Sequence, residues 1–135
     1  MRQDLEEKLQ EKYPIILRDM YGDKTKTCMT WGIECGDGWY NLLDNLMAFL
    51  QWHANKNNYP QVIATQIKEK FGTLSFYFKY DLESFQSSNG KIEYIEGAVD
   101  FAERMSTQIC EVCGKPGKIE RVNGWYSCKC DECKK

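Results

Sequence analysis

Four cysteines near the end of the chain are spaced as the ligands of a metal ion. Cys110 and Cys113 form one C-x2-C pair, Cys130 and Cys133 form a second, and sixteen residues separate the two pairs. Two residues between ligands let the chain turn so that both sulfurs reach one ion, and two such pairs complete a tetrahedron. This spacing predicts a bound Zn²⁺. Because four thiolates would fill every coordination position, the ion is expected to stabilise the fold and not to catalyse a reaction.

The residues between the two pairs favour a zinc ribbon, in which a β-hairpin connects two metal-binding turns. Asn123-Gly124 is typical of a two-residue hairpin turn and would pair residues 118–122 with 125–129. Such a module has too few residues to build a sufficient apolar core without a metal ion. Removal of the ion is therefore expected to unfold it.

Cys128 leaves the fourth ligand open to an alternative. It could replace Cys130 or Cys133, although the second C-x2-C pair mirrors the first and is favoured. In the predicted hairpin Cys128 would face Ile119, which suits a buried thiol. The seven cysteines are expected to be metal ligands or buried thiols before disulfides, as in a reducing compartment.

A second candidate for chemistry is the stretch TWGIECGDGWY at residues 30–40, which combines dense glycines with aromatic rings. The glycines lie where a helix is expected to begin, and free backbone N–H groups at a helix start attract anions. The candidate ligand-binding residues here are Trp31, Asp37, Gly38, Trp39 and Tyr40. The alternative is a helix cap with aromatic packing, because aspartate is an ordinary cap residue and its charge would repel an anion.

The third candidate is one face of a β-hairpin predicted over residues 62–70 and 74–80. Period-two alternation places mostly apolar residues on one face, whereas the opposite face collects three lysines with Gln66, Ser75 and Tyr77. Lysines beside an aromatic ring suit phosphate contact and base stacking. The candidate ligand-binding residues of this face are Lys68, Lys70, Tyr77 and Lys79. The alternative is a solvated sheet face whose lysines discourage edge pairing.

Residues that could form a catalytic site are sparse. The only histidine, His53, lies on the apolar stripe of a predicted helix, where a packed or hydrogen-bonded role is favoured over general-base catalysis. The sequence contains no phosphate-loop, serine-hydrolase or zinc-protease motif. Cys28 and Cys35 have no histidine nearby in the sequence, and a buried thiol is favoured for Cys35. A binding protein is therefore favoured over an enzyme.

The elements that would position these residues follow from the apolar spacing along the chain. The first is a helix over 2–21, which Pro14 interrupts so that residues 14–20 form a second short helix. An irregular link at 23–36 follows, and then a helix from Asp37 to about 55–58. The last elements are the hairpin with Gly72-Thr73 as its turn, a polar loop at 82–91 and a helix over 92–108. We expect an α+β fold in which helices pack on the hairpin or a small antiparallel sheet. The predicted domains are an α+β domain, 1–109, and the zinc-ribbon module, 110–135.

Composition limits the partners. The chain carries 18 basic and 20 acidic residues, a net charge of -2, whereas general nucleic-acid binders are usually strongly basic. Residues 110–135 hold six basic and four acidic residues, so a module with four thiolates and one Zn²⁺ is near neutral. Nucleic acid is therefore a disfavoured partner. The sequence shows neither a membrane-spanning segment nor a secretory signal, and a cytoplasmic location is expected. The oligomeric state is left open.

Four strings of the sequence resemble a family of small, uncharacterised bacterial and bacteriophage proteins with the patterns WGFECGDGW, QVKEKFGGLRFY and CExCGxPG. The strings are TWGIECGDGWYNLLDNL, QIKEKFGTLSFYF, AERMSTQICEVCGKPG and GWYSCKCDEC, and the match runs from about Tyr13 to Cys133. The resemblance implies the metal-binding pairs and a prokaryotic or phage source. It singles out Trp31, Asp37, Gly38, Trp39, Lys68, Lys70, Phe71 and Gly72 as motif positions. Ser75 stands where the family often has arginine, which weakens a phosphate clamp on this strand.

These observations favour a non-enzymatic, zinc-containing binding protein. The hypothesis is a phage-encoded protein that acts in the host cytoplasm and captures a host protein or a small anionic, nucleotide-like ligand, with an anti-defence role. The alternative is a nucleic-acid-associated zinc-ribbon protein, such as a transcription accessory factor, and the acidic balance of the chain argues against it.

Overall fold

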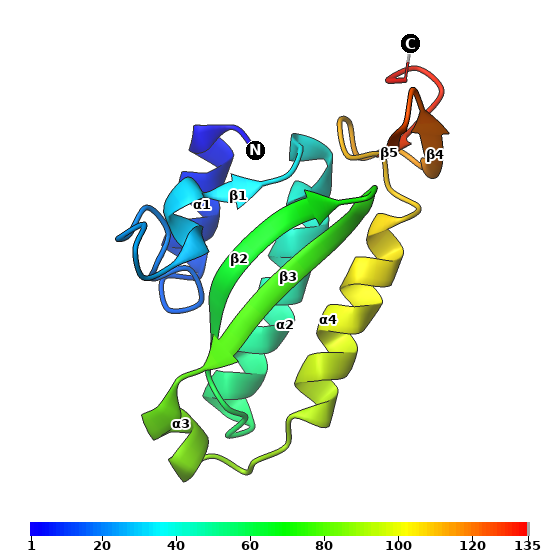
Figure 1. Ribbon diagram of the computed structural model, residues 1–135. Helices are drawn as coiled ribbons and strands as arrows, with labels where there is room; N and C mark the ends of the chain where they lie inside the picture. Colours follow the sequence, from blue (N-terminus) through cyan, green and yellow to red (C-terminus); the bar gives the residue numbers. More distant parts are fainter. Residues whose placement is uncertain (135) are drawn as a thin grey trace.

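The computed structural model describes residues 1–134 of the chain. Its elements, in chain order, are α1 Gln3–Lys12, the 3-10 turn η1 Cys28–Trp31, β1 Ile33–Glu34, the 3-10 turn η2 Asp37–Trp39, α2 Tyr40–Lys56, β2 Val62–Lys70, β3 Thr73–Tyr80, α3 Leu82–Ser87, α4 Glu93–Ser106, β4 Lys118–Val122 and β5 Trp125–Lys129. In Figure 1, α2 and α4 lie side by side behind the β2–β3 hairpin, and the β4–β5 hairpin lies at the C-terminal end. Helices with small sheets confirm the α+β class.

The larger sheet has three strands in the order β1-β2-β3. β2 and β3 are antiparallel, as expected for a hairpin, whereas β1 is parallel to β2 and pairs Ile33 with Ile67 and Glu34 with Lys68. The sheet is therefore mixed and not wholly antiparallel. The sequence could not reveal β1, because two residues are too few to show an alternating pattern.

The β2–β3 turn consists of Phe71 and Gly72, and not of Gly72 and Thr73 as expected. Both turn residues have positive φ, 53° and 84°, and Lys70 pairs with Thr73. A type I′ turn has this geometry, and its twist matches that of the flanking strands. The predicted strand pairing is wrong by two residues. Side-chain alternation has a period of two, so the two faces near the turn keep their predicted composition.

One extra residue interrupts the pairing of β2 with β3. Ala64 pairs with Phe78 and Gln66 with Tyr77, which leaves Thr65 unpaired as a β-bulge. A bulge bends its strand and redirects the side chain of the extra residue. Beyond the bulge, Val62 and Ala64 lie on the buried face opposite Tyr80 and Phe78.

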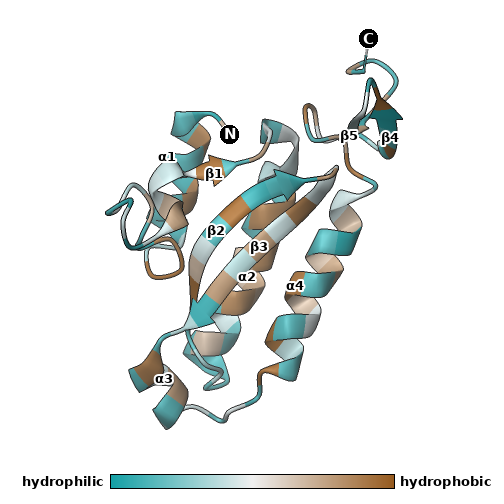
Figure 2. Ribbon diagram, viewed as in Figure 1, coloured by the Kyte–Doolittle hydropathy of each residue, from teal (hydrophilic) through white to brown (hydrophobic). Residues whose placement is uncertain are grey.

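The apolar core lies between the sheet and the two long helices. Figure 2 shows hydrophobic residues recurring along α2, α4 and the strands of the larger sheet. Side chains from all of these elements are buried, among them Leu43 and Met47 of α2, Ile67 of β2, Leu74 of β3 and Ile95 of α4. Burial of a side chain of this size contributes about 1.5–3 kcal/mol. Among residues 1–134, no helix is long and apolar enough to cross a membrane.

The region before α2 differs from the sequence prediction in two places. Residues 14–20 form successive turns and not a second helix, although Ile16 and Leu17 are fully buried. Asp37 does not cap α2: it lies in η2, and α2 begins three residues later at Tyr40. The carboxylate of Asp37 instead accepts a hydrogen bond from the backbone N–H of Arg2, at 2.8 Å. Asp37 therefore bonds to a residue distant in the sequence, and the N-cap residue of α2 is Trp39.

The region between β3 and β4 confirms one helix and adds another. α4 occupies Glu93–Ser106, within the helix predicted over 92–108. Residues 82–91, expected to be a polar loop, contain the short helix α3. Asp81 caps α3, because its Oδ2 accepts a hydrogen bond from the backbone N–H of Ser84 at 3.1 Å.

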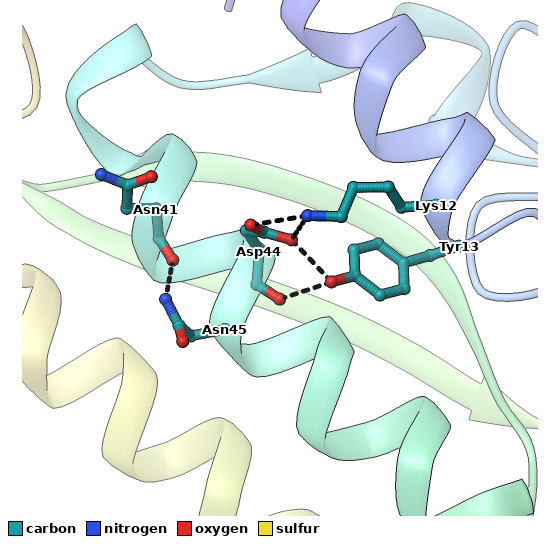
Figure 3. A network of polar contacts seen from close by, with 5 residues as sticks. All are labelled: Lys12, Tyr13, Asn41, Asp44 and Asn45. Carbon is teal, nitrogen blue, oxygen red and sulfur yellow. Dashed lines mark hydrogen bonds and ion pairs between the residues drawn. The ribbon is translucent and has the colours of Figure 1, made fainter.

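A polar network attaches α1 to α2 (Figure 3). The Asp44 carboxylate of α2 lies 2.7 Å from Lys12 Nζ and accepts a hydrogen bond from the Tyr13 hydroxyl at 2.6 Å. Burial of Asp44 opposes its ionisation, but the bonds from Lys12 and Tyr13 outweigh that effect and lower its pKa. Burial and the Asp44 hydrogen bond together raise the pKa of Tyr13.

Candidate metal centre and anion cleft

The four cysteines of the two C-x2-C pairs meet in space. The Sγ atoms of Cys110, Cys113, Cys130 and Cys133 all lie within 4.8 Å of one another. Cys113 Sγ and Cys130 Sγ are 3.6 Å apart, close to the edge of about 3.8 Å of a tetrahedron with Zn–S bonds of about 2.3 Å. A disulfide needs about 2.05 Å, and all seven cysteines are free. The four sulfurs therefore fit a tetrahedral metal ion.

Local backbone hydrogen bonds shape the first metal-binding turn. The Cys110 N–H donates to the Lys115 carbonyl at 2.7 Å, and the Gly114 N–H donates to the Cys110 carbonyl at 2.9 Å. Gly114 has a φ of 81°, a conformation that glycine adopts without strain. The second turn is closed in the same way, by the Lys134 N–H on the Cys130 carbonyl at 3.2 Å.

The cluster favours thiolate at one cysteine and opposes it at others. Burial opposes ionisation of Cys110, but backbone N–H groups, including those of Cys113 and Cys130, outweigh it and lower its pKa to about 6. Hydrogen bonds with Cys130 and Cys113 raise the pKa of Cys133 to about 12. Four thiolates this close repel one another, and a divalent cation would relieve that repulsion.

Cys128 lies outside this cluster. Its thiol is buried and donates a hydrogen bond to the Ile109 carbonyl at 3.2 Å, and its strand partner is Ile119, as predicted. Burial raises its pKa, and the neighbouring charge of Cys110 adds to the rise. Of the two alternatives for the fourth ligand, the geometry favours Cys130 with Cys133.

Residues 110–134, here called the four-cysteine tail, contact the glycine-rich stretch at 30–40. The backbone N–H of Gly38 donates to the Glu111 carbonyl at 2.7 Å, and that of Gly36 donates to Glu111 Oε2 at 2.9 Å. Trp39 is fully buried, and its indole N–H donates to the Ile109 carbonyl at 2.8 Å. The glycine-rich stretch is therefore the seat on which the first metal-binding turn rests.

The glycines of this seat are required by close backbone approach. A Cβ atom on Gly38 would lie 2.1 Å from the Cys110 carbonyl oxygen, and one on Gly36 would lie 2.3 Å from the Glu111 carbonyl oxygen. Both distances are far shorter than any real contact of a Cβ atom, and the opposing atoms belong to the backbone. No side chain at either position can be accommodated without separating the tail from the seat.

The candidate ligand residues of the 30–40 stretch do not form a common pocket. Trp39 is fully buried and presents no surface to a ligand, which corrects its assignment as a ligand contact. Gly38 is held by the tail and Asp37 by Arg2, while Tyr40 is half-buried and packs against the core. Trp31 is 65% exposed. Most of these residues are therefore buried or hydrogen-bonded within the protein.

An open cleft of about 520 Å³ lies on the face of the sheet opposite α2 and α4. It is lined by Lys24, Thr25, Lys26, Thr27, Cys28, Thr65, Gln66, Tyr77 and Lys79. Its strand wall includes the bulge residue Thr65 with Gln66 of β2 and Tyr77 and Lys79 of β3, and residues 24–28 form the other wall. Bulges are over-represented next to active sites. The volume lies within the range of about 300–1,000 Å³ for small-molecule sites.

The chemistry of the cleft is cationic and rich in hydroxyl groups. Three lysines, 24, 26 and 79, line it, and none of its lining residues is acidic. Asp23 lies next to this wall, but its carboxylate accepts hydrogen bonds from the Thr25 N–H at 2.9 Å and hydroxyl at 2.7 Å. Those bonds hold the pKa of Asp23 below its ordinary value and order the loop. Tyr77 is 43% exposed, so its ring is available for stacking.

The cleft contains two of the four predicted ligand residues of the hairpin, Tyr77 and Lys79. Lys68 and Lys70 lie on the same face but outside the cleft. Glu34 of β1 pairs with Lys68, so the face also carries a negative charge that the hairpin alone does not. The structure thus separates the predicted lysines into two groups.

Sequence reasoning missed the wall formed by residues 24–28. The signal is the string KTKTC, in which lysine alternates with threonine within a stretch that was expected to be only a link. An irregular segment has no fixed side-chain period, so only the fold could place its lysines opposite Lys79. Cys28 of the same wall is exposed, whereas burial raises the pKa of Cys35 to about 12, as favoured for a buried thiol.

Comparison with known proteins returns no match among protein-family models, curated proteins or solved structures.

Proposed function

We propose that this protein is a binding protein that holds a structural Zn²⁺ in its tail and captures a small anionic, nucleotide-like ligand in the cleft. One observation carries the proposal: three lysines converge beside an exposed tyrosine in a cleft whose lining has no acidic residue. Lysines favour a phosphate group, and the tyrosine ring offers a stacking surface for a base. The proposal rests on the side chains of β2, β3 and residues 24–28.

Capture, and not turnover, is the activity we propose. Within residues 1–134, the lining of the cleft has no histidine, aspartate or glutamate, the side chains that most often act as general acids and bases. The metal ion would be held by Cys110, Cys113, Cys130 and Cys133, and when bound it would stabilise the tail. Four protein ligands leave it no open position for a substrate.

Isothermal titration calorimetry with ADP, AMP, inorganic phosphate and adenosine tests the proposal. We expect ADP to bind more tightly than AMP, and adenosine to bind weakly, because lysine–phosphate attraction supplies most of the affinity. Affinity for ADP should fall as salt is added, since ions screen exposed charges. Absence of heat and of a thermal shift with all three phosphate-containing probes at millimolar concentration would reject the proposal.

Substitutions locate the binding to the cleft. Lys79→Gln and Lys26→Gln should each weaken ADP binding about tenfold or more, because each removes a charged hydrogen-bond donor. Lys68→Gln is the matched control, since Lys68 lies on the same sheet face outside the cleft. Tyr77→Ala should remove a stacking contribution of about 1–3 kcal/mol, which Tyr77→Phe retains. Equal weakening by Lys68→Gln would place the ligand elsewhere.

A second surface favours the capture of a host protein. Phe71 and Trp125 are 70% and 80% exposed, and the Phe71 ring contacts that of Tyr126 edge to face at 6.5 Å. Lys70 Nζ lies 6.0 Å from the centroid of Phe71, and Arg121 lies 5.8 Å from that of Tyr126. Exposed aromatic residues with arginine are typical of the residues that dominate protein interfaces.

Cross-linking in a bacterial lysate tests this second candidate. The same host protein should be captured by the unaltered chain and lost with the double variant Phe71→Ala and Trp125→Ala. Phage origin and an anti-defence role are proposals that the family resemblance supports. For the nucleic-acid alternative, a gel shift at low salt is the test.

A further inference from the structure

The outer side of α2 and α4 exposes an unusual number of aromatic rings. Phe49, Trp52, Tyr94 and Phe101, here called the aromatic face, are 39%, 55%, 59% and 65% exposed. His53 connects its members: its ring lies 4.3 Å from Phe49 and 4.9 Å from Trp52. His53 also contacts Tyr59 at 4.9 Å, and Tyr59 contacts Tyr94 at 5.9 Å. These contacts join Phe49, Trp52 and Tyr94, and Phe101 lines the same groove as Phe49 and Tyr94.

A groove of about 370 Å³ runs between the two helices within this face. It is lined by Leu42, Asn45, Leu46, Phe49, Tyr94, Ala98, Phe101, Ala102 and Met105, none of which carries a charge. Ala98 and Ala102 are small, so the groove is hollow next to the protruding ring of Phe101. One surface thus offers both a protrusion and a hollow.

Area and charge favour a second copy of this chain as the occupant. Four aromatic side chains of about 150–250 Å² each, exposed to this degree, leave roughly 400 Å² of apolar surface in water. That is about half of the roughly 800 Å² that each partner buries in a standard stable interface, before the remaining groove residues are added. Two identical faces without charge do not repel each other, whereas a charged partner would find no counter-charge among the groove residues.

We propose that two copies associate through their aromatic faces, with Phe101 of each chain entering the groove of the other. α2 and α4 run antiparallel (Figure 1), so a twofold axis between the faces produces an antiparallel four-helix arrangement. The anion cleft lies on the opposite face of the sheet, and both clefts stay open in the dimer. The inference is independent of the function proposed above.

Sedimentation equilibrium and light scattering between about 1 and 300 μM test the dimer. The chain has a mass of 15.8 kDa, and we expect twice that mass at high concentration, with a dissociation constant that salt changes little. Phe101→Glu should weaken association at least about 30-fold, because it places a charge at the centre of the interface. Phe101→Ala is the second variant, and circular dichroism confirms that both fold.

Phe71→Glu is the matched control, because Phe71 is as exposed as Phe101 but lies at the hairpin turn, away from the aromatic face. It should leave the dimer intact. A mass of 15.8 kDa at every concentration would overturn the inference, as would a dimer that Phe101→Glu and Phe101→Ala leave unchanged. A monomer whose groove takes up an amphipathic helix of another protein would equally overturn it.

Discussion

The four-cysteine tail and the helix–sheet layer, which comprises α1, α2, α4 and the strands β1–β3, are held together by different forces. The layer buries a large set of apolar side chains from every one of its elements. In the described part of the tail, only Cys110 and Cys128 are buried. The layer is therefore stabilised by apolar packing, whereas the tail has contacts with the layer and four clustered cysteines that could hold a metal ion.

The comparison shows that a motif with the residue types of a ligand site can instead have a structural role. Glycines and a tryptophan at residues 36–39 lie where the two regions meet, and hydrogen bonds to Glu111 and Ile109 connect them. Close backbone approach explains the glycines, and burial explains Trp39. The exposed lysines of residues 24–28 are not explained by packing, and this difference separates a structural seat from a candidate binding site.

Metal removal should have the largest effect, because the tail and the layer should respond to it differently. We expect chelation to unfold residues 110–134, because the tail lacks an apolar core, while the layer keeps its helices. Amide NMR spectra of the apo protein should show loss of dispersion in the tail, and mass spectrometry should give one Zn²⁺ per loaded chain. Cys113→Ser should abolish metal binding, whereas Cys128→Ser should retain it. Apo protein with native tail resonances would contradict the comparison.

Substitution in the seat should have the next largest effect. Gly38→Ala should lower the free energy of unfolding by about 3 kcal/mol, because the new Cβ would overlap the Cys110 carbonyl oxygen. Gly97→Ala is the control: beyond the neighbouring residues and the backbone of its own helix, no atom lies within 4 Å of a Cβ there, and alanine in helix α4 should stabilise by about 0.5–1 kcal/mol. Denaturant unfolding measures both. A neutral Gly38→Ala would mean that the tail is not seated on the layer.

Acid should weaken the layer through Asp44. The folded-state pKa of Asp44 is lower than its ordinary 3.8, so its stabilising contribution is complete above that pH and is lost as pH falls further. Lys12 has a pKa raised above 10.5, so its contribution is lost only as pH rises past that value. Asp44→Asn should cost about 1–2 kcal/mol at pH 7 and reduce the acid dependence of unfolding. Asp4→Asn, at an exposed pair, should change neither quantity.

The rate at which the cysteine thiols are labelled should distinguish the tail from the layer. This test does not depend on a change in stability. In a metal-bound protein one cysteine, Cys28, should react rapidly with a small maleimide, because Cys35 and Cys128 are buried and the other four would hold the ion. Chelation should raise the number of reactive thiols to five or more. Mass spectrometry of the labelled chain counts them, and Cys28→Ser should abolish the rapid phase. Bound ADP should slow labelling of Cys28, which lines the cleft.

The parts of the protein that could be predicted depend on local patterns. The hairpin of β4 and β5 has the expected turn and pairing, because Asn123-Gly124 specifies a type I′ turn by itself. The predicted β2–β3 turn is wrong because Phe71 adopts positive φ, which a bulky residue rarely does. The pairing of the short strand β1 and the hydrogen bond of Asp37 depend on partners distant in the sequence.

The sequence by itself determined the α+β class and the four cysteines that converge, because ligand spacing and apolar periodicity act over a few residues. Only the tertiary structure decided that the glycine-rich stretch seats the tail and that residues 24–28 complete a cationic cleft with Tyr77 and Lys79. The physical reason is that such contacts join segments far apart in the chain. Their geometry is set by packing of the whole layer and leaves no pattern in the local sequence.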